Sequence, residues 1–189
     1  MLTHSLKLIS LSVCLIWASA CTPVLSNKPV SDNKGSRSLG TLYNDQLIET
    51  TTVDAILRAN PLLETAHVSA ISVNGIVLLI GQVPSEDTKI IAGARARKVS
   101  NVRKVHNELL VSGPSSYVVR TNDTLITTKV KTRMVGETGF PANRIKVVTE
   151  NGVVYLMGLV TQAEGEWAVR VASNASGIQR IVKVFEYID

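Results

Sequence analysis

The clearest pattern in the chain is a change of hydrophobic period in its second half. Apolar residues first recur at every fourth position, at Ile126, Val130 and Met134, which is typical of the buried stripe of a helix. Ile145, Val147 and Thr149 then lie at every second position, which predicts a strand. Asn151-Gly152 then favours a tight hairpin turn, because both residue types accept a positive φ. This succession predicts a helix followed by a β-hairpin.

The segment after the hairpin turn completes one small unit. Its strand continues to residue 160, and Gly158 inside it indicates a bulge or a close approach of another backbone. The sequence Thr-Gln-Ala-Glu at 161–164 has the pattern of a capping box and predicts a helix that ends at Gly177. Residues 178–188 are predicted to return as the last strand. The residues expected to face the core from these elements are Val154, Leu156, Val160, Trp167 or Ala168, Val171 and Ala175.

The start of this unit has several possible signals. Asn122 or Asp123 is predicted to cap the first helix, because either side chain accepts hydrogen bonds from free N–H groups of a first turn. The residues Tyr-Val-Val at 117–119 are expected to add a short strand before that helix, with a weaker counterpart at 42–43 in the first half. The Gly-Pro-Ser-Ser sequence that starts at residue 113 opens a linker, which we place at 113–120.

The first half of the chain repeats the pattern of the second. The segment 74–83 recurs 77 residues later as 151–160, with the turn and the inner glycine at the same places. Shorter matches lie at the same spacing upstream and at 76 residues downstream. We therefore predict a tandem duplication of residues 41–112 and 121–189. Each copy is expected to be an α+β domain of order α-β-β-α-β, with two helices packed on one face of a small mixed three-stranded sheet. Ser85 is the predicted cap of the second helix in the first copy.

The N-terminal segment indicates export. Lys7 precedes an apolar run over residues 8–18, and small residues then lead to Cys21, which is the order of a signal peptide. We assign residues 1–20 to this signal peptide. Residues 21–40 are rich in Ser, Asn, Pro and Lys and are predicted to form a flexible tether.

The residues before Cys21 also resemble a bacterial lipobox, in which the Cys is acylated and becomes the first residue of the mature protein. Ser19 and Ala20 fit this pattern, whereas Leu is usual where this chain has Ala18. The resemblance implies a lipid anchor on Cys21, and Thr22 after it favours the outer membrane over retention in the inner membrane. A plain secretory signal that is cut after Ala20 is the alternative.

Composition narrows the possible functions. The net charge of +5 is compatible with anionic partners without naming one, and aromatic residues make up 4% of the chain. Both cysteines, Cys14 and Cys21, lie in or beside the leader, so no disulfide framework is expected. His67 and His106 lack the spacing of metal ligands and are expected to be partly exposed strand residues. Because we find no catalytic constellation or phosphate loop in the pattern, we predict neither an enzyme nor a cofactor.

The repeated pattern resembles a known family. The hairpin sequence Asn-Gly-x-Val-x-Leu-x-Gly-x-Val at 151–160, a helix of small residues and Gly-Ile-x-x-Ile-x-x-Val from Gly177 are similar to the BON domain. Two such copies behind a lipobox resemble the dual-BON outer-membrane lipoproteins that bind lipid and are associated with division and outer-membrane stress. The resemblance implies a non-enzymatic protein that faces the periplasm and supports outer-membrane integrity, also at the division site. It further implies binding of anionic phospholipids, such as phosphatidylglycerol and cardiolipin, through the first helix of the second domain.

The residues of that helix are compatible with a place at a membrane surface. When Ile126, Val130 and Met134 face the core, Leu125 points away from them. An exposed apolar residue beside cations is typical of a helix that lies on a lipid surface. The family often carries Trp where this chain has Leu125. The candidate lipid-binding residues are Asn122, Asp123, Leu125, Thr128, Lys129, Lys131, Thr132 and Arg133.

The first copy is expected to lack this surface. At a spacing of 77, the residues that match Ile126, Lys129 and Lys131 are Glu49, Thr52 and Asp54. Its basic residues lie on and after its second helix. We expect them to face water, and the other domain or lipid are the alternatives. These residues are Arg95, Arg97, Lys98, Arg103 and Lys104.

Other functions remain possible on this pattern. A protein-interaction module would dock an envelope partner on the sheet or in an interdomain groove, and it predicts an exposed apolar patch rather than a basic one. Binding of nucleic acid is disfavoured by export and by the scarcity of aromatic residues for base stacking.

Overall fold

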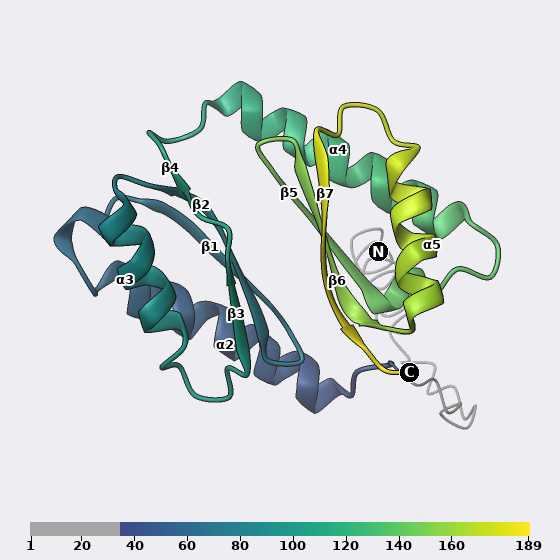
Figure 1. The fold of residues 1–189 in the computed structure, drawn as a ribbon, viewed down its shortest axis with the longest axis horizontal. Helices are drawn as coiled ribbons and strands as arrows, with labels where there is room; N and C mark the ends of the chain where they lie inside the picture. The colour runs from purple at the N-terminus through teal and green to yellow at the C-terminus, as the bar shows by residue number, and fades with distance from the viewer. Residues whose placement is uncertain (1–34) are drawn as a thin grey trace, which may run out of the picture. The chain divides into compact units, whose positions relative to one another are not determined.

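A computed structural model describes residues 35–189, which belong to one compact unit (Figure 1). The predicted signal peptide, Cys21 and most of the predicted tether lie outside the described residues. The first repeat consists of α2 (Leu39–Leu57), the 3₁₀ turn η2 (Pro61–Leu63), β1 (His67–Val73), β2 (Ile76–Val83), α3 (Glu86–Ala96), β3 (Lys104–Asn107) and β4 (Leu110–Val111). The second repeat consists of α4 (Tyr117–Gly136), η3 (Ala142–Arg144), β5 (Ile145–Glu150), β6 (Val153–Val160), α5 (Gln162–Ser173) and β7 (Arg180–Tyr187).

The two sheets have the predicted mixed topology. In each, a hairpin joins two antiparallel strands, β1–β2 or β5–β6, and a helix then carries the chain to a strand parallel to the second. This crossover is needed because a parallel neighbour cannot be reached through a tight turn. The third strand of the first sheet is divided into β3 and β4, which both pair with β2, so that sheet has four strands rather than the predicted three.

The hairpin turns confirm the interpretation of the Asn-Gly pairs. Asn74 and Gly75 have φ values of 53° and 74°, and Asn151 and Gly152 have 49° and 73°. Two consecutive positive φ values match the type of turn that follows the twist of paired strands. Gly158 confirms the predicted close approach, because a Cβ at this position would lie 2.5 Å from the backbone oxygen of Arg144, the residue that precedes β5.

Each repeat has a core between its helices and one face of its sheet. The predicted stripe of Ile126, Val130 and Met134 is buried there in the second repeat. The predicted caps of α3 and α5 are present, each with a complete capping box. Helix α5 ends at Ser173, before the predicted Gly177, which instead adopts a positive φ in the loop that leads to β7.

The opposite faces of the two sheets bury each other, and the helices cover the outer faces (Figure 1). The third hydrophobic cluster lies at this junction and consists of Ile71, Val73, Ile76, Leu78, Ile80, Tyr155, Met157 and Val184. Every residue of β2 is therefore buried, whichever face it points to. Burial at the junction raises the pKa of Tyr155 to about 12. The junction makes the two repeats one structural unit.

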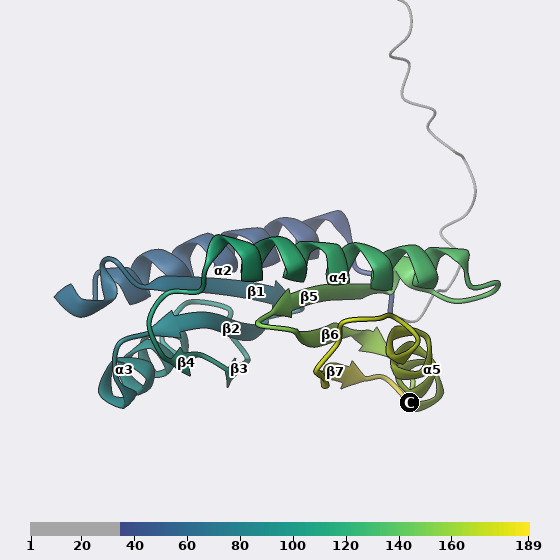
Figure 2. The same cartoon turned by 90° about the horizontal axis from the view of Figure 1, so that it is seen from above.

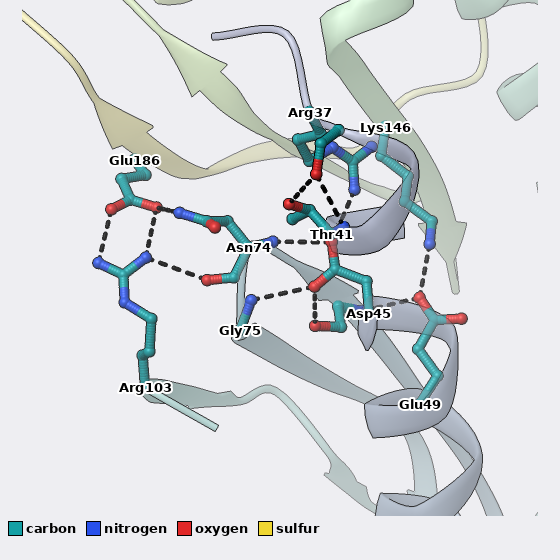
Figure 3. A network of polar contacts seen from close by, with 11 residues as sticks. Arg37, Thr41, Asp45, Glu49, Asn74, Gly75, Arg103, Lys146 and Glu186 are labelled. Carbon is teal, nitrogen blue, oxygen red and sulfur yellow. Dashed lines mark hydrogen bonds and ion pairs between the residues drawn. The ribbon is translucent and has the colours of Figure 1, made fainter. Parts of the chain in front are cut away.

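Polar contacts surround this junction (Figure 3). Arg103 of the first repeat donates two hydrogen bonds to the carboxylate of Glu186 in the second, at 2.7 and 2.9 Å, and Asn74 donates a third at 2.8 Å. Lys146 of the second repeat forms an ion pair of 2.6 Å with Glu49 of α2. Planar guanidinium–carboxylate pairs fix direction as well as distance, so these contacts define how the sheets face each other.

The Arg103–Glu186 pair predicts a loss of stability in acid. The hydrogen bonds from Arg103 have the largest effect on Glu186 and lower its pKa. Burial has the opposite effect but is weaker, so the pKa stays below its ordinary value of 4.5. A depressed folded-state pKa stabilises the fold above the unfolded pKa, and this stability is lost as pH falls through the folded pKa. We expect the free energy of unfolding, measured by urea titration, to decline below about pH 4.5 and to decline less steeply in Glu186→Gln. The exposed Glu166→Gln is the control and should follow the wild-type profile; equal slopes in all three proteins would contradict the prediction.

Candidate functional site

Helix α4 carries all eight candidate residues, but it starts earlier than predicted. Ser116 is the N-cap, since its hydroxyl accepts a hydrogen bond from the N–H of Val119. The prediction of Asn122 or Asp123 as the cap is therefore wrong, and so is the short strand at 117–119, which forms the first turn of α4. Its expected counterpart at 42–43 likewise lies in helix α2. The predicted linker and tether also ended too late. Their last residues, 117–120 and 39–40, are helical, because we did not recognise Ser116 and Ser38 as the caps of α4 and α2.

Asp123 does not face the surface. Its buried carboxylate accepts hydrogen bonds from the N–H groups of Asn151 at 2.8 Å and Gly152 at 2.7 Å, and so it clamps the hairpin turn onto α4. Asp45 of α2 holds the other hairpin turn in the same way, through the N–H groups of Asn74 and Gly75. Asp123 is therefore a structural residue, and its assignment to the lipid-binding set is corrected on this ground.

Asp45 shows how strongly such a carboxylate is held (Figure 3). Burial would raise its pKa, but hydrogen bonds from Gly75, Ser72, Asn74 and Arg37 together hold the pKa below its ordinary value. The carboxylate is thus ionised at neutral pH although its residue is buried. Hydrogen bonds are the cause, because donors that point at the carboxylate stabilise its charged form more than its protonated form.

The other seven candidates lie on the exposed side of α4, as the helical spacing predicted. They are Asn122, Leu125, Thr128, Lys129, Lys131, Thr132 and Arg133. Leu125 is 55% exposed and lies in the interior of the helix rather than in its first turn. In the described part of the chain, its side chain is therefore open to solvent, unlike the side chains of the core.

The charge on this side of α4 has one sign. Lys129, Lys131 and Arg133 are exposed, and no carboxylate in residues 35–189 forms an ion pair with them. Arg120 adds a fourth exposed cation, which we missed because the helix was expected to start after it. The single acidic residue of α4 is the buried Asp123. The exposed surface of the helix therefore presents four positive charges without an acidic one.

Apolar side chains lie among these cations. Tyr117, Val118 and Val135 are 77%, 75% and 76% exposed, and with Leu125 they extend along the helix. We call this surface the α4 face; it consists of Tyr117, Val118, Arg120, Asn122, Leu125, Thr128, Lys129, Lys131, Thr132, Arg133 and Val135. Such a mixture of cations and exposed apolar groups is characteristic of interfacial helices.

A groove runs beside the α4 face. Its volume is about 560 Å³, and it separates α4 from strand β1 of the first repeat. Arg120, Thr128 and Lys131 line one side, and His67 and Ser69 line the other. Both histidines discussed above lie in strands and are partly exposed, as predicted.

Helix α2 is the internal comparison for α4. The caps Ser38 and Ser116 and the clamps Asp45 and Asp123 show that the helices match at a spacing of 78, not 77. The pairing of Glu49 with Ile126 was therefore wrong by one residue. The correct counterparts of Leu125, Lys129, Lys131 and Arg133 are Leu47, Thr51, Val53 and Ala55. Leu47 is 52% exposed, so the apolar residue occurs in both repeats, whereas the cations occur in the second alone.

Within residues 35–189, no group of three His, Cys, Asp or Glu side chains is arranged to hold a metal ion. In the same range no helix combines the length and the apolar character that crossing a bilayer requires. Fold and site together define a tandem-repeat α/β protein whose distinctive surface is a basic, partly apolar helix.

Comparison with known proteins agrees with this class. The family model of the BON domain matches residues 44–113 and 122–189, and the chain belongs to the BON-domain family. It is 40% identical over 153 residues to the outer membrane lipoprotein DolP of Haemophilus influenzae, covering 81% of this chain and 79% of that protein. It is 31% identical over 152 residues to the 21 kDa hemolysin of Actinobacillus pleuropneumoniae, covering 80% and 78%. Osmotically-inducible protein Y of Escherichia coli is 27% identical over 146 residues, covering 76% and 72%.

The clamp on the hairpin turn predicts a stability effect for Asp123. Asp123→Ala leaves two N–H groups without their acceptor and should lower the free energy of unfolding by about 2–4 kcal/mol, as removal of a charged acceptor from buried donors does. Urea unfolding of the chain from residue 22 measures this effect. Asn122→Ala, the exposed neighbour, is the control and should change stability by less than about 0.5 kcal/mol. If Asp123→Ala lowers the free energy of unfolding no more than Asn122→Ala does, Asp123 does not hold the hairpin turn.

Proposed function

We propose that this protein is a periplasm-facing outer-membrane lipoprotein that binds anionic phospholipid through the α4 face. The observation that carries the proposal is the charge of that face, which has four exposed cations and no exposed acid beside the 55% exposed Leu125. The proposed role is non-enzymatic. By resemblance to the dual-BON lipoproteins, it includes support of outer-membrane integrity and action at the division site.

The proposed anchor rests on the sequence before Cys21 and on the name of the Haemophilus relative, which is an outer membrane lipoprotein. An acyl chain on Cys21 would hold the folded unit close to the leaflet. Sixteen residues separate Cys21 from the cap Ser38, and they can span at most about 55 Å when fully extended. Tethering at this distance raises the effective concentration of the α4 face at the lipid surface.

Magnitudes decide whether such a face can bind. A basic residue close to an anionic leaflet contributes about 1 kcal/mol, so four of them supply about 4 kcal/mol before any apolar contact. Burial of apolar area adds about 25 cal/mol per Å², and Leu125, Tyr117, Val118 and Val135 offer that area. The sum is enough for reversible binding that depends on lipid charge and salt, but not for permanent insertion.

The test uses the chain from residue 22, which contains the whole compact unit and neither cysteine. Binding is measured by flotation with vesicles of phosphatidylcholine alone and with added phosphatidylglycerol or cardiolipin, at low and high salt. We expect binding to the anionic vesicles that salt weakens. Leu125→Glu and Lys129→Glu should each lower it about tenfold, because each places a negative charge on the α4 face.

The control for this test is Leu47→Glu. Leu47 occupies the equivalent place in α2 with nearly the same exposure, so the substitution matches Leu125→Glu in chemistry and in its effect on the fold. It should leave vesicle binding unchanged. Equal loss in both variants, or no preference of the wild type for anionic vesicles, would exclude the α4 face as the lipid site.

A second candidate function follows from helix α2. Leu39, Leu42, Tyr43 and Leu47 are 85%, 42%, 74% and 52% exposed along its first turns, and no exposed charge separates them. An apolar stripe of this kind favours docking of an envelope protein. If this is the main function, Leu47→Glu should impair complementation of a deletion strain while vesicle binding stays intact, and Leu125→Glu should have no effect on complementation.

A further inference from the structure

A second group of cations lies where α3 ends and β3 begins. Arg95, Arg97, Lys98 and Lys104 are exposed, and no carboxylate in the described range pairs with them. We call this group, together with Arg103, the basic end of the first repeat. The helix dipole explains a cation in the last turn of α3, such as Arg95. It also favours Arg97 at the C-cap, but it does not explain Arg103 and Lys104, which lie further along the chain.

The basic end contains a hollow. Its volume is about 340 Å³, and it is lined by Arg97, Arg103 and Lys104 with Val102 and Val105. Arg103 is held in place by its two hydrogen bonds to Glu186. One guanidinium is thus oriented by the junction, while Arg97 and Lys104 remain exposed and are not paired with an acid. Because Glu186 balances the charge of Arg103, the positive charge available at the hollow comes from Arg97 and Lys104. Two such cations beside a shallow hollow are suited to the oxygens of a phosphate group.

The second repeat shows that the fold does not require these cations. Arg103 and Gln179 are equivalent, because each donates its N–H to the hairpin glycine of its own repeat, Gly75 or Gly152. The residues that match Arg97, Lys98, Arg103 and Lys104 are then Ser173, Asn174, Gln179 and Arg180. One cation in the second repeat replaces four in the first, and α5 still forms and ends within one residue of the equivalent position.

The basic end and the α4 face lie on different parts of the surface. Helices α3 and α4 cover the outer faces of different sheets, and they lie apart in both views (Figures 1 and 2). A flat membrane that contacts α4 therefore leaves the end of α3 free. The unpaired cations of the α4 face and those of the basic end therefore lie on two separate surfaces.

We propose that the basic end of the first repeat is a second anion-binding surface, which takes the phosphate groups of an anionic phospholipid leaflet. With the α4 face on one lipid surface, as the proposed function requires, the protein then bridges two such surfaces. The α4 face has exposed apolar groups for insertion, whereas the basic end has cations around a hollow. Its contact is therefore electrostatic and is released by salt more readily than that of α4.

The experiment measures bridging and binding separately. The chain from residue 22 is mixed with two populations of phosphatidylglycerol-containing vesicles in different colours, and their co-localisation is counted; flotation measures binding to one population. Wild type is expected to bridge at low salt. The triple variant Arg97→Glu/Lys98→Glu/Lys104→Glu should bridge about tenfold less, while flotation through α4 falls much less. Reversal of Arg170, Arg180 and Lys183 to Glu is the control of equal charge change and should preserve bridging.

The outcomes separate this inference from the proposed function. If the triple variant and the wild type bridge equally, or if the wild type floats with anionic vesicles but does not bridge them, the second surface is refuted. If Leu125→Glu floats like wild type, the proposed role of α4 fails instead. A titration with inorganic phosphate, followed by amide NMR shifts of residues 97–104, distinguishes the source of the anion. Saturation at millimolar phosphate without bridging would assign the hollow to a free phosphate and overturn the membrane contact.

Discussion

The architecture depends on the burial of both faces of each β-sheet. A sheet covered by helices on one side only would leave Leu78 and Met157, which are fully buried, open to water. Pairing the two uncovered faces removes this apolar area from solvent, and the hydrophobic effect makes the pairing favourable in proportion to that area. The duplication is thus more than two copies in series, because neither copy can bury its inner sheet face without the other.

The junction also decides what remains outside. Once the sheets face each other, the outer layers are helical, and the outward sides of α2, α3, α4 and α5 are the surfaces that can meet a partner. The buried clamps fix α2 and α4 to their own hairpins: Asp45 joins its helix to a turn 30 residues further along the chain, and Asp123 does so over 29 residues. Rigid helices then present their exposed residues as defined surfaces, which is what a binding protein without a deep cleft requires.

The two repeats share their fold but differ in where their exposed cations lie. The first helices share a cap, a clamp and an exposed leucine, yet the cations at Lys129, Lys131 and Arg133 occur in α4 alone. At the other end of the motif the difference is reversed, since Arg97 and Lys98 face solvent where the second repeat has Ser and Asn. Surface positions tolerate such changes because they cost little stability, so function can differ between copies while the core stays the same.

The sequence by itself determined the elements, the duplication and the core stripe, because hydrophobic period, Asn-Gly turns and capping boxes depend on residues close together in the chain. It also placed Leu125 and the lysines of α4 correctly outside. The uninterrupted apolar run in β2 indicated burial on both faces of the sheet, a signal that we did not use because we looked only for alternating positions. Only the tertiary structure decided that Asp123 is a buried clamp, that α4 starts at Tyr117, and that the helices match at a spacing of 78. The clamp depends on contacts between residues far apart in sequence, where an aspartate that caps a helix and one that holds a distant turn look the same. The start of α4 depends on a local cap, but Ser116, Asn122 and Asp123 are all suitable cap residues, and only the structure shows that Ser116 is used.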